Sequence, residues 1–122
     1  MKGGHNMILD FIQSKKTGEL SWKFKGSVYT QKVENAKIIK NYEFLEKIFV
    51  IAVENKNSVL YVFDAEGNIY DKIISNNKFF IKGIRGGILQ PEFLITSENH
   101  EPTIYTYDVK NKKFINTGEI VK

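Results

Sequence analysis

The chain of 122 residues has the length of a single domain. It contains no cysteine, which excludes a disulfide scaffold, a thiolate zinc site and a cysteine nucleophile. The formal net charge is +4, but 17 of the 18 basic residues are lysines. Arginine makes the bidentate contacts that specific nucleic-acid readers favour. The composition therefore disfavours nucleic acid as the partner.

The residue types predict an all-β protein. Val, Ile, Thr, Tyr, Phe and Trp make up 46 residues, whereas Ala, Leu and Met make up only 11. β-branched and aromatic side chains fit a pleated, half-buried surface, and Ala and Leu are the best helix formers. We expect an antiparallel meander of about ten short strands that forms a curved sheet, a barrel or a partial propeller.

Apolar runs bounded by turn residues define the expected strands in chain order. They are Met7–Gln13, Glu19–Lys25, Ser27–Val33, Phe49–Glu54, Val59–Asp64, Ile69–Ile74, Lys78–Ile84, Glu92–Ser97, Thr103–Val109 and Lys113–Ile120. The strands from Phe49 to Ile84 are predicted to form one four-stranded meander. No apolar run approaches the roughly 20 residues of a membrane span, so we expect a cytoplasmic protein with no membrane partner.

The segment 34–47 allows two interpretations. Ile38, Tyr42, Leu45 and Ile48 have helical spacing, which permits one short helix. The corresponding stretch of the next repeat contains three glycines and a proline, which oppose a helix. We favour a strand at Lys37–Lys40 followed by a loop.

The chain contains an internal repeat of 44 residues. The segment from Phe49 to Asp64 aligns without gaps on the segment from Phe93 to Asp108, and six of these 16 positions are identical. We expect a single domain over 1–122 with repeat units at approximately 7–48, 49–92 and 93–122.

Two segments resemble β-propeller blade repeats. TGELSWKFKG (Thr17–Gly26) is similar to the Gly-x-x-x-Trp stretch of the quinoprotein type, and VLYVFDAEGNIY (Val59–Tyr70) is similar to the middle hairpin of many blades. The resemblance implies four-stranded units. A propeller needs at least about four blades to close, and about two and a half units are present, so a curved sheet or a barrel is favoured over a closed ring.

The polar residues form no convincing catalytic or metal-binding pattern. Asp64 and Asp108 share one repeat position, which favours a structural Asx turn over a carboxylate pair. Ser97, His100 and Asp108 lack the spacing of a nucleophile–base arrangement. The two histidines of the chain are too few for a histidine metal site. We therefore predict no enzyme activity, no metal and no cofactor.

Six residues are candidates for a binding surface. Trp22 is expected to be buried and would mark a binding hot spot only if it were exposed. Phe79 adjoins Phe80, so one of the two rings must leave the core unless both faces of the sheet are covered. The other candidates are Lys82 and Arg85 in a glycine-rich stretch, and Glu54 and Glu98 before the hairpin turns.

These observations predict a non-enzymatic protein-binding module. Its most concrete form is a small bacterial immunity protein that blocks a toxin or enzyme. The basic charge opposes inhibition of a nuclease, because such inhibitors tend to be acidic. The alternatives are a propeller-like module that assembles with itself and a nucleic-acid-binding domain of low specificity.

Overall fold

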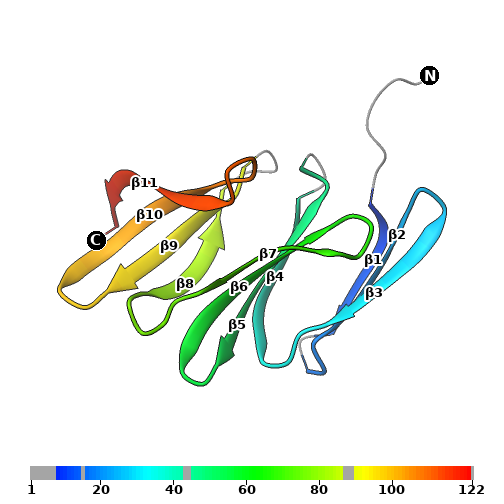
Figure 1. Ribbon diagram of the computed structural model, residues 1–122, viewed down its shortest axis with the longest axis horizontal. Helices are drawn as coiled ribbons and strands as arrows, with labels where there is room; N and C mark the ends of the chain where they lie inside the picture. Colours follow the sequence, from blue (N-terminus) through cyan, green and yellow to red (C-terminus); the bar gives the residue numbers. More distant parts are fainter. Residues whose placement is uncertain (1–7, 15, 43–44, 87–89, 122) are drawn as a thin grey trace.

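The computed structural model describes residues 8–14, 16–42, 45–86 and 90–121. Within these ranges, eleven strands form three antiparallel sheets that stand side by side (Figure 1). The predicted all-β antiparallel fold is confirmed. The described part of the chain contains no helix that is long and apolar enough to cross a membrane.

Each sheet is an antiparallel meander. The N-terminal sheet consists of β1 (Leu9–Ser14), β2 (Glu19–Phe24) and β3 (Ser27–Lys32). The central sheet consists of β4 (Ala36–Tyr42), β5 (Lys47–Glu54), β6 (Asn57–Asp64) and β7 (Ile69–Ile74). The C-terminal sheet consists of β8 (Phe80–Arg85), β9 (Glu92–Ser97), β10 (His100–Asp108) and β11 (Lys113–Ile120).

The described part of the segment 34–47 contains a strand, as we favoured, and it extends beyond the predicted Lys37–Lys40 at both ends. β4 covers Ala36–Tyr42 and pairs with β5 from Ala36↔Ala52 to Tyr42↔Lys47. The alternative of a helix around Ile38 and Tyr42 is therefore wrong. β-ladder pairing with an apolar neighbouring strand outweighs the helical spacing of the side chains.

The predicted meander from Phe49 to Ile84 is wrong at its last strand. β8 pairs with β9 and belongs to the C-terminal sheet. The connection from β7 to β8 carries the chain from one sheet to the next. It is held by buried hydroxyls, because the Ile81 N–H donates to Ser58 Oγ (3.0 Å) and the Ser58 N–H donates to Ser75 Oγ (3.1 Å).

The pairing register differs by one residue between the two copies of the sequence repeat, that is, between β5–β6 and β9–β10. Leu60 is buried on the side of the central sheet that faces the C-terminal sheet. Phe49 lies on that same side, but its repeat partner Phe93 faces back toward the central sheet and lies 5.9 Å from Phe49. The pairing of the strands shows why. Phe49 pairs with Val62, whose repeat counterpart is Thr106, but Phe93 pairs with Tyr105 instead. A one-residue slip turns a strand's side chains to the other face.

The central sheet is covered on both faces, which explains its continuous apolar runs. Alternate residues of β5 belong to two different cores: Ile48, Val50 and Ala52 pack against the N-terminal sheet, and Phe49 and Ile51 pack against the C-terminal sheet. The first core contains Trp22, whose Nε1–H donates to the carbonyl oxygen of Ala65 at 2.7 Å.

The outer face of the C-terminal sheet is partly covered by its own last strand. Between the pairs Thr103↔Ile120 and Tyr105↔Asn116, β11 contains an irregularity that bends it over the sheet. The Thr117 hydroxyl donates a hydrogen bond to the Ile104 carbonyl at 2.7 Å. Ile104 is fully buried.

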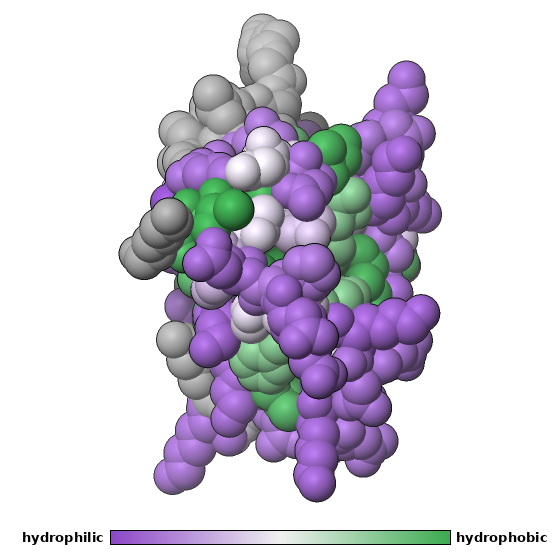
Figure 2. All heavy atoms as spheres, turned by 90° about the vertical axis from the view of Figure 1, so that its left-hand side faces the viewer, coloured by the Kyte–Doolittle hydropathy of each residue, from purple (hydrophilic) through white to green (hydrophobic). Residues whose placement is uncertain are grey.

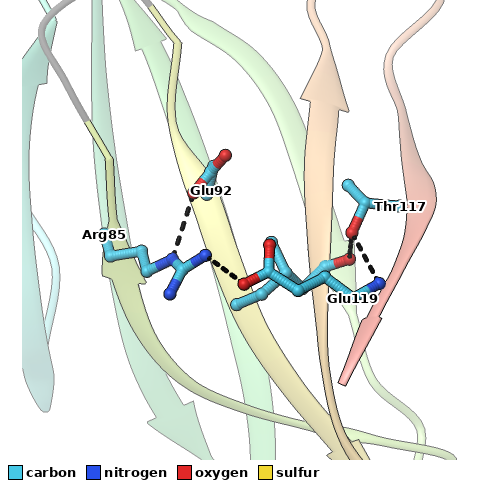
Figure 3. Close-up of polar contacts among 5 residues, drawn as sticks. Arg85, Glu92, Thr117 and Glu119 are labelled. Carbon is cyan, nitrogen blue, oxygen red and sulfur yellow. Dashed lines mark hydrogen bonds and ion pairs between the residues drawn. The ribbon is translucent and has the colours of Figure 1, made fainter. Parts of the chain in front are cut away.

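An ion pair spans the same face from one edge of the sheet to the other. Arg85 of β8 donates from Nη2 to Glu119 at 2.8 Å and from Nε to Glu92 at 3.1 Å (Figure 3). Figure 2 looks onto this side of the molecule and shows hydrophobic patches separated by hydrophilic side chains. Because these side chains are about half exposed, solvent screening leaves the ion pairs little weight in the stability of the fold.

The outer face of the N-terminal sheet alternates in the manner of a solvated sheet. In β2, Leu20 and Trp22 are buried in the core, and Lys23 and Glu19 are exposed on the opposite face. Two large apolar side chains also lie exposed on the strands that flank β2. Ile12 of β1 is 65% exposed, and Val28 of β3 is 62% exposed.

Candidate functional site

The structure distributes the six predicted binding residues over all three sheets. Trp22 is only 1% exposed, which leaves its indole ring no surface to offer a partner. Its expected burial is confirmed. Glu54 accepts a hydrogen bond from the Tyr61 hydroxyl within the central sheet. Lys82 is exposed on β8, and Arg85 is engaged by Glu92 and Glu119.

Phe79 and Glu98 are the two candidates that the structure brings to one place. Phe79 lies in the β7–β8 connection and Glu98 in the β9–β10 turn. Both line a shallow hollow of about 300 Å³ at the edge of the C-terminal sheet. The hollow is lined by Lys56, Asn77, Lys78, Phe79, Phe80, Thr96, Ser97 and Glu98.

A second hollow of about 410 Å³ adjoins the first and shares Phe79 with it. Aromatic, aliphatic and polar side chains line it: Lys78, Phe79, Ile95, Ser97, His100, Glu101, Thr103, Tyr105, Phe114 and Asn116. We call the two hollows together the rim site. It lies where the β7–β8 connection meets the β9–β10 hairpin, and these two turns lie along the lower margin of Figure 1.

Three half-buried aromatic rings form the apolar part of the rim site. Phe114 meets Phe79 edge to face at a centroid distance of 6.2 Å, and it meets Tyr105 in the same way at 6.3 Å. Aromatic pairs of this geometry are worth about 0.5–1.5 kcal/mol beyond the area that they bury. The rings therefore support one another while each leaves some surface open to a ligand.

Two hydrogen bonds hold the backbone just before Phe79. The Lys78 N–H donates to the Ser75 carbonyl at 3.0 Å, and the Asn77 N–H donates to Asn57 Oδ1 at 2.9 Å. Asn76 and Asn77 adopt positive φ values of 53° and 63°, which asparagine tolerates better than most residues. The aromatic ring is consequently presented from an ordered turn.

The structure does not bring together the three members of the nucleophile–base arrangement that the sequence suggested. Ser97 and His100 are paired across the hairpin and both line the larger hollow. Asp108, the third member of the arrangement considered from the sequence, ends β10 at its opposite end. There its carboxylate accepts hydrogen bonds from the backbone N–H groups of Lys110 (3.1 Å) and Asn111 (3.2 Å).

The predicted Asx turns are confirmed at both repeat positions. Asp64 Oδ1 accepts hydrogen bonds from the N–H groups of Glu66 (3.0 Å) and Asn68 (2.9 Å). The Asn111 side chain and turn backbone lower the pKa of Asp108, because they stabilise its ionised form. These carboxylates organise turns. In the described part of the chain, no three His, Asp or Glu residues are grouped as a metal site would require.

Glu54 disfavours ionisation of its partner Tyr61. Burial, the hydrogen bond to Glu54 and the charge of Glu54 together raise the pKa of Tyr61 from 10.0 to about 12. We expect the tyrosine absorbance at 295 nm to show a late transition to which Tyr61 contributes and which is still incomplete at pH 11. The neutral Tyr61 hydroxyl, bonded to Glu54, contributes its full stabilisation of the fold below pH 10. This stabilisation is lost as the pH rises toward 12, because the unfolded chain releases the Tyr61 proton more readily than the folded one.

A matched pair of variants checks the origin of this shift. Glu54→Gln should move the late tyrosine transition to lower pH, because it removes the negative charge that opposes ionisation. Glu34→Gln removes an exposed carboxylate in a turn and should leave the titration curve unchanged. An unaltered curve in Glu54→Gln would show that the carboxylate does not govern the pKa of Tyr61.

Comparisons with protein-family models, with curated proteins and with solved structures find no match. The functional argument for this chain therefore rests on the rim site itself. The sequence predicts Phe79 and Glu98 as binding residues but does not single out Tyr105, Phe114 or Asn116. These three residues belong to the last two strands, and only their packing under the β7–β8 connection brings them to Phe79. The clustering of aromatic residues near the C-terminus was the one available signal.

Proposed function

We propose that this chain is a protein-binding module that receives a side chain of a partner protein in the rim site. The observation that carries the proposal is the aromatic hollow of about 410 Å³ with polar groups around it. An apolar centre within a polar rim is the usual anatomy of a protein–protein contact. An apolar or aromatic side chain of the partner fits the three rings, and Lys78, Glu98 and Glu101 fix its orientation from the margin.

In the form that the sequence favours, the partner is a toxin or enzyme whose action the chain blocks. The position of the rim site supports inhibition. A partner whose side chain is held at the edge of the molecule has the three sheets next to it, and their bulk can block access to the partner's surface. The mixed charges of Lys56, Lys78, Glu98 and Glu101 do not demand a strongly acidic or basic partner.

The test compares partner capture by wild-type protein and by Phe79→Ala. We expect wild-type protein to retain a partner from the cell of origin, and Phe79→Ala to bind that partner at least about thirty-fold more weakly, as for a hot spot of 2 kcal/mol or more. Ile69→Ala is the matched control, because Ile69 is 57% exposed on β7 and lies outside the rim site.

Two outcomes would contradict the proposal. Equal binding by wild-type protein and Phe79→Ala would remove the rim site as the contact surface. Failure of wild-type protein to retain any partner, both in the source cell and on co-expression with the neighbouring gene product, would remove the binding function. Circular dichroism of Phe79→Ala separates lost binding from lost folding.

Self-assembly is a second candidate, and the exposed side chains of Ile12 and Val28 favour it. Both project from the outer face of the N-terminal sheet, where a second copy would cover them. Size-exclusion chromatography with light scattering decides this alternative. A concentration-dependent rise in mass that Ile12→Thr abolishes would support it, and a constant monomer mass at high concentration would exclude it.

A further inference from the structure

Two lysines from different sheets converge on the ring of Tyr70. Lys47 Nζ lies 4.6 Å from the ring centroid, and Lys112 Nζ lies 4.3 Å from the same centroid. Lys47 begins β5 in the central sheet, and Lys112 lies in the β10–β11 turn of the C-terminal sheet. That turn is at the other end of β10 from the rim site and lies near the upper margin of Figure 1.

Hydrogen bonds hold this arrangement in place. The Tyr70 hydroxyl donates to the Val109 carbonyl at 2.6 Å, which fixes the ring of one sheet to the turn of the next. Lys47 Nζ donates to the Leu45 carbonyl at 3.4 Å, and the Lys47 side chain is half-buried. An aromatic face and backbone groups therefore position the two cations.

The two ammonium groups carry like charges and lie against one aromatic ring. Each nitrogen lies within 4.6 Å of one ring centre, so they are separated by less than twice that distance. Among the described residues, ion pairs join Lys23 to Asp10 and Arg85 to Glu92 and Glu119, and none involves Lys47 or Lys112. Mutual repulsion at this separation is relieved when an anion is bound.

Three carboxylates near the two lysines have other partners. Asp64 pairs with Lys47 in the β5–β6 ladder, and its Oδ1 accepts hydrogen bonds from the N–H groups of Glu66 and Asn68. Asp108 begins the same turn as Lys112, and its side chain accepts hydrogen bonds from Lys110 and Asn111. Asp71 adjoins Tyr70 in β7 and accepts a hydrogen bond from the Tyr107 hydroxyl at 2.5 Å. These carboxylates reduce the local positive potential. However, hydrogen bonds hold Asp64 and Asp108 in their own turns and hold Asp71 against the Tyr107 hydroxyl.

We propose that Lys47, Tyr70 and Lys112 form a binding site for a phosphate-bearing anion. Two separate ammonium groups match a ligand with two or more negative charges, and lysine binds phosphate as a point charge. Lys110 and Lys113 lie within two residues of Lys112 in the chain and add positive charge to this turn. The inference is independent of the rim site, because the two sites share no residue.

Inorganic pyrophosphate is the probe, titrated at constant ionic strength and followed by amide chemical shifts. We expect saturable shifts at Tyr70, Val109 and Lys112, and binding at least about ten-fold weaker in the double variant Lys47→Gln/Lys112→Gln. The double variant Lys37→Gln/Lys40→Gln removes the same charge from exposed positions of β4 and should bind as wild type does.

The result that overturns the proposal is an equal loss of pyrophosphate binding in the two double variants, because this would reflect net charge alone. Absence of saturable shifts in wild-type protein with both pyrophosphate and a short oligothymidylate would also overturn it. Lysine-dependent binding of pyrophosphate assigns the site to a free phosphate compound. Lysine-dependent binding of the oligonucleotide alone assigns it to a nucleic-acid backbone.

Discussion

Replacement of Phe49 by alanine should lower the free energy of unfolding by about 3–5 kcal/mol, the usual cost of truncating a buried phenylalanine. Phe49 is completely buried between the central and C-terminal sheets. Its ring contacts Tyr42 and Tyr107 edge to face at centroid distances of 5.4 and 5.6 Å. The substitution leaves a cavity that these rigid rings cannot fill, and small domains have only about 5–15 kcal/mol of stability in total.

Urea denaturation followed by tryptophan fluorescence measures this loss. The sole tryptophan, Trp22, lies in the other core, so its signal reports whether the N-terminal sheet unfolds together with the rest. Phe80→Ala is the matched control, because Phe80 is 40% exposed and should cost less than about 1 kcal/mol. A loss in Phe49→Ala no greater than in Phe80→Ala would contradict the packing between these two sheets.

Gly18→Ala should destabilise the chain by about 2–5 kcal/mol. Gly18 has a φ of +77°, which costs an L-residue about 1–2 kcal/mol. A methyl group there would lie 1.9 Å from the Val33 carbonyl oxygen, and overpacking of this kind adds about 1–3 kcal/mol. The Val33 N–H also donates to the Gly18 carbonyl at 2.8 Å, so the two backbones cannot separate without losing this bond.

Gly26→Ala separates the two contributions. Gly26 has nearly the same φ of +81°, but no atom lies within 4 Å of where its methyl group would be. The Gly26→Ala variant should lose only the about 1–2 kcal/mol that a positive φ costs an L-residue. The difference in denaturation midpoint between the two variants measures the close approach at Val33. Equal losses in both variants would show that this approach relaxes without cost.

The local structure of this chain follows closely from residue types. The expected strand Phe49–Glu54 lies within β5 of Lys47–Glu54, and Ile69–Ile74 coincides with β7. The turns at Asp64 and Asp108 form as predicted, because an aspartate side chain can satisfy the N–H groups of its own turn. These features depend on interactions within a few residues of each other.

The candidate site was accessible from the sequence only in part. Adjacent aromatic residues at Phe79 and Phe80 marked a position where one ring had to leave the core unless both faces were covered, and Phe79 does line the rim site. Tyr105 and Phe114 reach the same hollow because β10 and β11 pair with each other and lie beside the β7–β8 connection. That neighbourhood joins segments distant in sequence, which periodicity does not reveal.

The sequence by itself determined the all-β class, most strand positions and the turn chemistry, since side-chain shape and short-range hydrogen bonding govern these features. Only the tertiary structure decided how the strands divide into sheets. The helical spacing around Tyr42 lost to pairing with β5, and β8 joined β9 instead of β7. The face of Phe93 was settled by a one-residue shift in its ladder. Pairing and register depend on which apolar faces can be buried against each other, and that is a property of the assembled sheets.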